Sequence, residues 1–429
     1  MASLPPCLRN HRNLSSTILR SLSSLSKKGS NMSSHVERTP LHGELAAPQA
    51  LNAEFPAPKR TRVFFVDNLR VSLTILVIVH HLAITYGALG AWYFQDPNKD
   101  MLATVVLSIL VAIDQAFFMG FFFLLSGYFT PGSYDRKGGR TFLWERSLRL
   151  GIPLLVYDLV FDPLVLFMAG GVHQSYWSFY GAFLLQGKMI GTGPSWFILA
   201  LLFFAVLYAL GRWFTRQQTS QLKTEGHPPT FSSTLLFVLA LTVVTFVVRI
   251  WWPLGSYAIF GFQLAEFAQY ISLFAIGLVA YRHNWFLYLP DALGRVWLRI
   301  AIGAMLLFPL MILALGVVGH ADLFEGGWAW QALLYALWES VVCVGLCIGL
   351  LVLFRRHLNA QGRLRKALSE AAYTVYLIHP LIIVPLAYAA RSIALYPLLK
   401  FALVVLIAVP LCFFAGYVLR KIPFMHKIL

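Results

Sequence analysis

The fold is decided by the stretch Asp67-Asn68-Leu69-Arg70-Val71-Ser72-Leu73-Thr74-Ile75-Leu76-Val77-Ile78-Val79-His80-His81-Leu82, which opens the first long apolar segment. Eleven residues separate Arg70 from His81, which at about 100° and 1.5 Å per residue is three helical turns and about 16 Å. The two side chains are therefore predicted to share one helix face, with His80 about 80° away from it. A titratable group inside a bilayer is costly unless it is paired or faces a wet cavity. A lone histidine would suit a hydrogen bond between helices, but the aligned arginine favours a functional site.

The composition is typical of a polytopic membrane protein. Of the 429 residues, 58% are hydrophobic and only 12% are charged, which is far from a soluble globular domain. The formal net charge of +16 would suit a nucleic-acid binder, but the basic residues lie in short loops between apolar runs. That distribution orients membrane proteins and contacts anionic lipid headgroups. We therefore expect a lipid bilayer as a partner and no nucleic acid. No cluster has metal-ligand spacing, so no metal is expected.

Residues 1–60 form a separate region that is rich in Ser, Arg, Lys and Pro, with no acidic residue before Glu37. We expect it to be disordered, and to be either a targeting segment or the product of a start assigned upstream of Met32. The membrane domain is predicted over residues 61–429.

Ten apolar segments of spanning length follow. They cover approximately residues 69–90, 101–129, 148–169, 194–214, 231–250, 263–281, 300–318, 329–354, 371–393 and 398–419. Basic residues cluster before the first segment and after every second one, which predicts that both termini are cytoplasmic. The predicted fold class is an all-α polytopic protein with about ten transmembrane helices, located in the cell (inner) membrane.

Further motifs follow the first segment in a fixed order. Phe122-Phe123-Leu124-Leu125-Ser126-Gly127-Tyr128-Phe129 runs into a basic loop with Arg146 and Arg149, and Gly193-Pro194-Ser195-Trp196-Phe197 and Tyr373-Thr374-Val375-Tyr376-Leu377-Ile378-His379-Pro380 come later. With Arg70-x10-His81, this set resembles the acyltransferase 3 family of integral membrane acyltransferases over about residues 62–420. The chain is most similar to the glucan succinyltransferase-like branch. Ile198-Leu199-Ala200 stands where other branches have a glutamate after the tryptophan, so no glutamate is carried over.

The resemblance implies that an acetyl- or succinyl-type group passes from cytosolic acyl-CoA to a hydroxyl of an extracytoplasmic glycan. It implies no bound cofactor, and it leaves open a partner protein on the far side. Arg70, Arg146 and Arg149 are the expected phosphate ligands, because guanidinium binds phosphate in bidentate fashion. Arg146 and Arg149 would equally suit a positive-inside anchor pair. His81 is the expected base, or a transient acyl carrier.

Buried polar residues supply the remaining candidates. Asp158 is the expected catalytic partner of His81, as the carboxylate of a triad is for its histidine. The further candidate substrate contacts are Asp114, Asp162, Glu339, His379 and Trp196. The alternatives are buried hydrogen bonds for the carboxylates, a kink at Pro380 for His379, and packing for Trp196 and Tyr376. A proton-coupled secondary transporter would use the same buried residues, and it is the alternative function.

Overall fold

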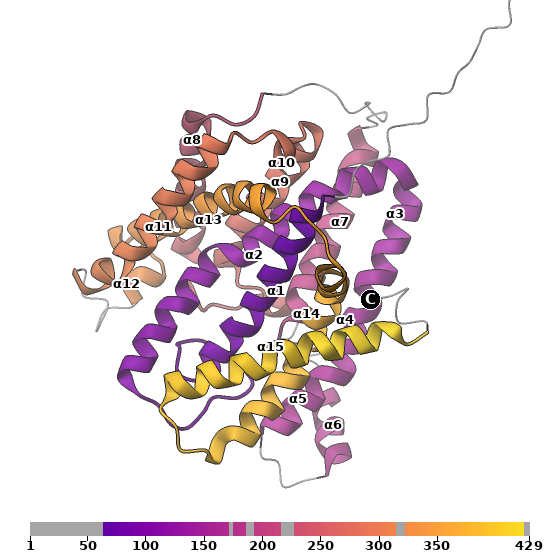
Figure 1. Cartoon of the computed structure of the whole chain (residues 1–429), viewed down its shortest axis with the longest axis vertical. Coiled ribbons are helices and arrows are strands. Elements are labelled where there is room, and N and C mark those ends of the chain that lie inside the picture. The colour runs from indigo at the N-terminus through magenta and orange to yellow at the C-terminus, as the bar shows by residue number, and fades with distance from the viewer. Residues whose placement is uncertain (1–62, 171–174, 186–192, 216–226, 315–321, 424–429) are drawn as a thin grey trace, which may run out of the picture. The chain divides into compact units, whose positions relative to one another are not determined.

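The computed structural model describes residues 63–170, 175–185, 193–215, 227–314 and 322–423. These residues form helices joined by turns and loops (Figure 1). The prediction made for residues 1–60 falls outside them. The helices are α1 (Phe64–Thr85), α2 (Met101–Lys137), α3 (Gly139–Arg146), the π-helical turn η1 (Ser147–Gly151), α4 (Ile152–Val156), the π-helical turn η2 (Tyr157–Phe161), α5 (Asp162–Ala169), α6 (Tyr176–Leu185), α7 (Ser195–Thr215), α8 (Phe231–Trp251), the 3-10 turn η3 (Ile259–Gly261), α9 (Leu264–Arg282), α10 (Trp285–Tyr288), α11 (Asp291–Ala314), α12 (Asp322–Glu325), α13 (Trp330–His357), α14 (Arg363–Ala389), the 3-10 turn η4 (Ala390–Ser392) and α15 (Pro397–Lys421).

Within the described residues, ten helices or helix runs are long and apolar enough to cross a membrane. This confirms the predicted all-α polytopic fold, and the chain is an integral membrane protein. The first span differs from its predicted range of 69–90, because α1 begins at Phe64 and ends at Thr85. The chain turns just beyond, at Gly87, whose φ of +143° is strained for any residue with a side chain. His81 therefore lies one turn from the end of α1 rather than near its middle.

Helix α1 lies in the interior of the bundle. It packs against α2, α13, α14 and α15, and with α2 it runs through the middle of Figure 1. In the most apolar part of each span, 67% of the residues of α1 and of the span that contains α14 are buried, but only 17% of those of α11. Large apolar side chains on α11, such as Leu306 and Leu313, stay exposed, as expected of a lipid-facing helix. Side chains on α1 and α14 can therefore meet away from lipid.

Helices α2 and α9 pack closely because glycines face each other. A Cβ atom at Gly127 would collide with the backbone carbonyl of Phe274, and one at Gly277 would collide with that of Leu124. Small residues allow two helix backbones to approach where lipid provides no hydrophobic drive. Gly127 belongs to the Phe-Leu-Leu-Ser-Gly-Tyr-Phe motif, so that glycine serves helix packing.

Two prolines break the regular hydrogen bonding of the third span, which contains both π-helical turns. A proline has no amide hydrogen, so the carbonyl four residues before it loses its helical donor. Pro153 frees the carbonyl of Arg149, which accepts a hydrogen bond from the Tyr373 hydroxyl at 2.9 Å. Pro163 frees the carbonyl of Leu159, to which a second tyrosine donates at 3.1 Å. The first of these bonds ties the backbone of Arg149 to α14.

Candidate active site

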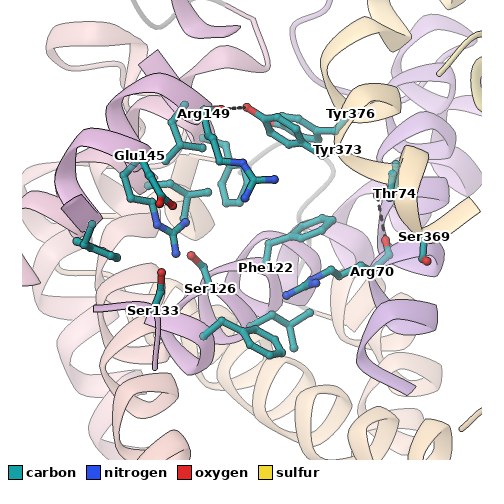
Figure 2. Close-up of a pocket in the computed structure, with 18 of the residues that line it drawn as sticks. Arg70, Thr74, Phe122, Ser126, Ser133, Glu145, Arg149, Ser369, Tyr373 and Tyr376 are labelled. Carbon is teal, nitrogen blue, oxygen red and sulfur yellow. Dashed lines mark hydrogen bonds between the residues drawn. The ribbon is translucent and has the colours of Figure 1, made fainter. Parts of the chain in front are cut away.

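A cavity of about 370 Å³, here called the basic cavity, opens beside the first turns of α1. Its charged lining residues are Arg70, Lys137, Glu145, Arg146 and Arg149. Glu145 pairs with Lys137, so the three arginines bring together an excess of positive charge. Figure 2 shows the side chains of Arg70 and Arg149 pointing into the cavity from different sides. A cavity with several converging guanidinium groups suits a ligand with several phosphates.

The guanidinium groups are held by aromatic rings and one carboxylate. Arg70 is 3.4 Å from the Oδ1 atom of Asp67 and lies over the ring of Phe129 at 4.7 Å from its centroid. Arg146 lies over the ring of Phe142 at 5.4 Å. Cation–π contacts fix a guanidinium without consuming all of its donors. The N–H groups of Arg146 can therefore still reach a ligand.

A second cavity, of about 550 Å³, contains His81 and is here called the histidine cavity. Arg70 and Thr74 line the basic cavity while Val77 and His81 line the histidine cavity. One stripe of α1 therefore serves both, as the spacing predicts. His80 points elsewhere: it is 6% exposed and its ring centroid lies 5.0 Å from that of Phe118.

The ring of His81 is held by a second histidine, His379 on α14. The Nδ1 atom of His81 lies 3.1 Å from the Nε2 atom of His379, whose Nδ1 atom lies 2.6 Å from the carbonyl oxygen of Tyr376. That carbonyl is available because Pro380, four residues later, has no amide hydrogen to give it. A carbonyl can only accept, so in the neutral ring the Nδ1 atom of His379 carries the proton and its Nε2 atom accepts.

The same reasoning assigns the tautomer of His81. Its Nδ1 atom donates to His379, which leaves the Nε2 atom of His81 with a free lone pair. An imidazole with one nitrogen fixed by a partner and the other unprotonated is the arrangement of a general base. The Tyr-x-x-His-Pro sequence thus sets the protonation pattern of a histidine on another helix.

The loop between α1 and α2 covers His81 with Trp92, a residue the sequence reasoning missed. The two rings stack with centroids 3.7 Å apart and an interplanar angle of 18°. The loop is fixed to α15 by Asp96, whose Oδ2 atom lies 2.5 Å from the Nζ atom of Lys400 in a fully buried pair. The indole therefore restricts the motion of the imidazole and shields it on one face.

Three aromatic rings stand at the border of the two cavities, and we call them the aromatic partition: Phe122, Phe197 and Tyr376. Tyr376 lines both cavities. The centroid of the Phe197 ring lies 5.5 Å from that of Tyr376 and 5.7 Å from that of Phe122. The hydroxyl of Tyr376 donates to the carbonyl of Pro194 at 2.5 Å. Residues from three separate motifs therefore meet where the cavities adjoin.

The residue that contacts the Nδ1 atom of His81 is His379, whereas Asp158 was the predicted partner. Asp158 accepts a 2.6 Å hydrogen bond from the Ser195 hydroxyl. Asp162 lines the histidine cavity and accepts a hydrogen bond from Tyr93. Burial, with the nearby Tyr157 hydroxyl and Asp162, raises the pKa of Tyr93 well above its ordinary value. The phenol therefore stays protonated and acts as a donor to Asp162.

Three predicted substrate contacts, Asp114, Glu339 and His379, line neither cavity. Asp114 faces His80, with its Oδ2 atom 3.9 Å from the Nδ1 atom of that ring. Glu339 is 3% exposed and pairs with Arg249 at 2.7 Å. Both carboxylates face neighbouring helices, which their position along a segment could not reveal. Trp196 does line the histidine cavity.

Ten spanning helices around adjoining basic and histidine-bearing cavities suit a membrane-embedded group-transfer enzyme. A family model described as an acyltransferase domain matches residues 63–417. The chain belongs to the acyltransferase 3 family and is an O-acyltransferase, which decides against the transporter alternative. Family membership also means that it acts on an acyl donor and an acyl acceptor.

Curated relatives share most of their length with this chain. It is 24% identical over 342 residues to the glucans biosynthesis protein C of Salmonella paratyphi B (strain ATCC BAA-1250 / SPB7), and to the proteins of the same name from Salmonella heidelberg (strain SL476) and Salmonella agona (strain SL483). Each alignment covers 76% of this chain and 82% of the relative. The relationship is distant. No solved structure matches the chain.

Proposed function

We propose that the protein transfers an acetyl- or succinyl-type acyl group from acyl-CoA to a hydroxyl of an extracytoplasmic glucan or related glycan. The observation that carries this proposal is His81, which lines the histidine cavity beside the basic cavity and is held from behind by His379. The phosphates of CoA bind Arg70, Arg146 and Arg149, which are the only arginines among the described residues lining either cavity. The name of the curated relatives supports a glucan as the acceptor.

The proposed reaction needs a general base and a route by which the thioester of acyl-CoA reaches that base. The Nε2 atom of His81 takes the proton from the acceptor hydroxyl, and the hydroxyl oxygen attacks the thioester carbonyl. The carbon–sulfur bond breaks as the new ester forms, and the CoA thiolate takes the proton back from His81. His379 keeps the Nδ1 proton of His81 in place throughout, as the third member of a triad does. An acyl-imidazole on His81 is the alternative route to the same products.

The two substrates reach the site from opposite ends of the bundle. Arg70 and His81 are about 16 Å apart along α1, so the pantetheine arm must extend from the basic cavity past the aromatic partition. The clustering of basic residues in alternate loops favours the cytoplasm as the side on which the basic cavity opens. The acceptor then enters the histidine cavity from the far side. Acyl transfer and passage of the acyl group across the membrane are one event.

Purified protein in nanodiscs tests this proposal directly. Wild-type protein is supplied with labelled acetyl-CoA or succinyl-CoA and a gluco-oligosaccharide, and the ester is detected by mass spectrometry. His81→Gln should lower the rate by about 10²- to 10⁴-fold, since glutamine can hydrogen-bond but cannot take up a proton at neutral pH. His80→Gln is the matched control and should keep most activity, because His80 does not line the cavity.

Either of two results would overturn the proposal. Wild-type protein that forms no ester with either donor would refute the substrate assignment. An active His81→Gln variant would show that His81 is not the base.

A further inference from the structure

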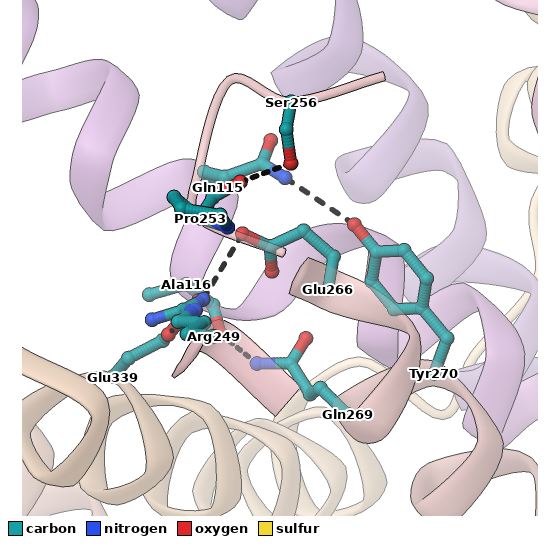
Figure 3. Close-up of polar contacts among 9 residues, drawn as sticks. All are labelled: Gln115, Ala116, Arg249, Pro253, Ser256, Glu266, Gln269, Tyr270 and Glu339. Atoms are coloured by element: carbon teal, nitrogen blue, oxygen red, sulfur yellow. Dashed lines mark hydrogen bonds and ion pairs between the residues drawn. The ribbon is translucent and has the colours of Figure 1, made fainter. Parts of the chain in front are cut away.

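A buried ionic cluster joins α8, α9 and α13. The Nη2 atom of Arg249 lies 3.1 Å from the Oε1 atom of Glu266 and 2.7 Å from the Oε2 atom of Glu339. The three residues are 0%, 2% and 3% exposed, respectively. Figure 3 shows both carboxylates converging on the one guanidinium. Removing each of the three charged groups from water costs several kcal/mol. The attraction between the guanidinium and the carboxylates offsets part of this cost.

A cluster with only a structural role needs one carboxylate, because one guanidinium neutralises one. The second carboxylate leaves the cluster either with a surplus negative charge or with a proton that the two glutamates share. Ionisable groups in membrane-spanning helices are expensive and usually functional. The two glutamates differ in their positions: Glu266 lines the histidine cavity, whereas Glu339 lines neither cavity.

Glu266 has spare hydrogen-bonding capacity in that cavity. Its Oε1 atom accepts a hydrogen bond from Arg249, and a proton shared with Glu339 is its other contact in the cluster. A carboxylate has about four lone-pair sites, so acceptor capacity is left for a ligand. Gln115 and Tyr270 line the same cavity, and the Gln115 amide donates to the Tyr270 hydroxyl at 3.2 Å. Figure 3 shows the carboxylate of Glu266 between Arg249 and this pair. Three polar side chains thus converge on one part of the cavity.

Aromatic side chains form much of the remaining wall. Trp92, Trp196, Tyr257 and Phe267 line the cavity, and the Trp196 and Tyr270 rings stack with centroids 5.6 Å apart. A sugar ring presents C–H groups on its faces and hydroxyls around its edge. Flat apolar walls with a few convergent polar groups fit that distribution, because the walls fix the ring and the polar groups fix its orientation.

We propose that Glu266, with Gln115 and Tyr270, binds a second hydroxyl of the acceptor, so that the enzyme selects polyhydroxylated acceptors over simple alcohols. This inference rests on the proposed function. A hydroxyl both donates and accepts, so it pairs with Glu266 whether that group is ionised or protonated. Arg249 and Glu339 orient Glu266 without touching the acceptor. Glu266 therefore binds the acceptor, and the proton transfer stays with His81.

The test compares two acceptors and two matched variants. Glu266→Leu and Glu339→Leu each leave one carboxylate on Arg249, so both keep a balanced ion pair. The acceptors are a gluco-oligosaccharide and 1-propanol, which offers a hydroxyl to His81 and nothing to a second subsite. Glu266→Leu should raise the KM for the oligosaccharide by about 10- to 100-fold, the usual loss for a hydrogen bond to a charged group. Its activity with 1-propanol and its KM for acetyl-CoA should match wild type.

The controls separate this role from a structural one. Glu339→Leu should leave the KM for the oligosaccharide within about twofold of wild type, even if both variants lose thermal stability. Glu266→Gln should recover part of the KM lost by Glu266→Leu, because its amide still hydrogen-bonds a hydroxyl, and it decides the test if Glu266→Leu is not folded.

Three results would overturn the inference. An unchanged KM for the oligosaccharide in the Glu266 variants, or an equal loss with 1-propanol, would refute it while leaving the proposed function intact. Wild-type protein that acylates no oligosaccharide would refute both.

Discussion

Replacing His379 with phenylalanine tests whether the second histidine positions the first. His379 is 0% exposed, and its Nε2 atom accepts from the Nδ1 atom of His81 over 3.1 Å. Phenylalanine is of similar shape but cannot accept a hydrogen bond. The variant therefore leaves the N–H group of His81 without its partner and lets the ring adopt other tautomers and orientations. We expect kcat to fall while the KM for acyl-CoA stays unchanged, because His379 does not line the basic cavity.

The size of the effect follows from the contact that is lost. A buried donor left without its acceptor costs about 1–3 kcal/mol, which corresponds to roughly 5- to 150-fold in rate if the whole loss is felt in the transition state. The ceiling is the contribution of the base itself, about 10²- to 10⁴-fold. His379→Phe should therefore be less damaging than His81→Gln. His379→Gln should retain more activity than His379→Phe, because its carbonyl can reach the position of the Nε2 atom.

The assay is acyl transfer from labelled acyl-CoA by purified, monodisperse variants, with kcat and both KM values measured separately. Thermal stability is recorded in parallel, so that loss of folded protein is not read as loss of catalysis. Wild-type kcat in a folded His379→Phe variant would show that His81 is oriented without His379. A raised KM for acyl-CoA at unchanged kcat would place His379 in the donor site and refute the reasoning.

Three further predictions concern the donor site, the proline and the topology. Arg149→Ala should raise the KM for acyl-CoA by about 10- to 150-fold, through loss of one charge-assisted contact, whereas Arg299→Ala, on the exposed surface of α11, should not; equal effects would make Arg149 a topology anchor only. Pro380→Ala supplies an amide N–H that competes with the His379 ring for the carbonyl of Tyr376, so kcat should fall several-fold in a protein whose unfolding transition by calorimetry is unchanged; an unchanged kcat would contradict that competition. Cysteines introduced at Arg140 and Ser175, both exposed, should react with impermeant reagents from the cytoplasm and from the outside, respectively; labelling from one side would contradict the ten-span topology.

Helix formation and the sharing of a helix face are local properties, so the sequence alone specified them. Runs of about twenty apolar residues specify spanning helices because a bilayer core requires satisfied backbone hydrogen bonds. The spacing of Arg70 and His81 specifies a common face because it is close to three whole turns. The convergence of Arg70 with Arg146 and Arg149 in the basic cavity was also predicted, since all three lie near the same ends of their segments.

The partner of His81 was decided only by the tertiary structure. His379 lies 298 residues away in the chain, and nothing local to either residue states how α1 and α14 are rotated towards each other. Asp158 and Asp162 are four residues apart, a spacing that puts two side chains on one face of a regular helix. Asp158 lies in the π-helical turn Tyr157–Phe161, and this turn changes the direction of the side chains that follow it. Glycine contacts, proline-freed carbonyls and buried ion pairs set the rotations and depths of the helices. Because those contacts join residues distant in sequence, helical periodicity predicts which residues share a face, and only packing decides what that face meets.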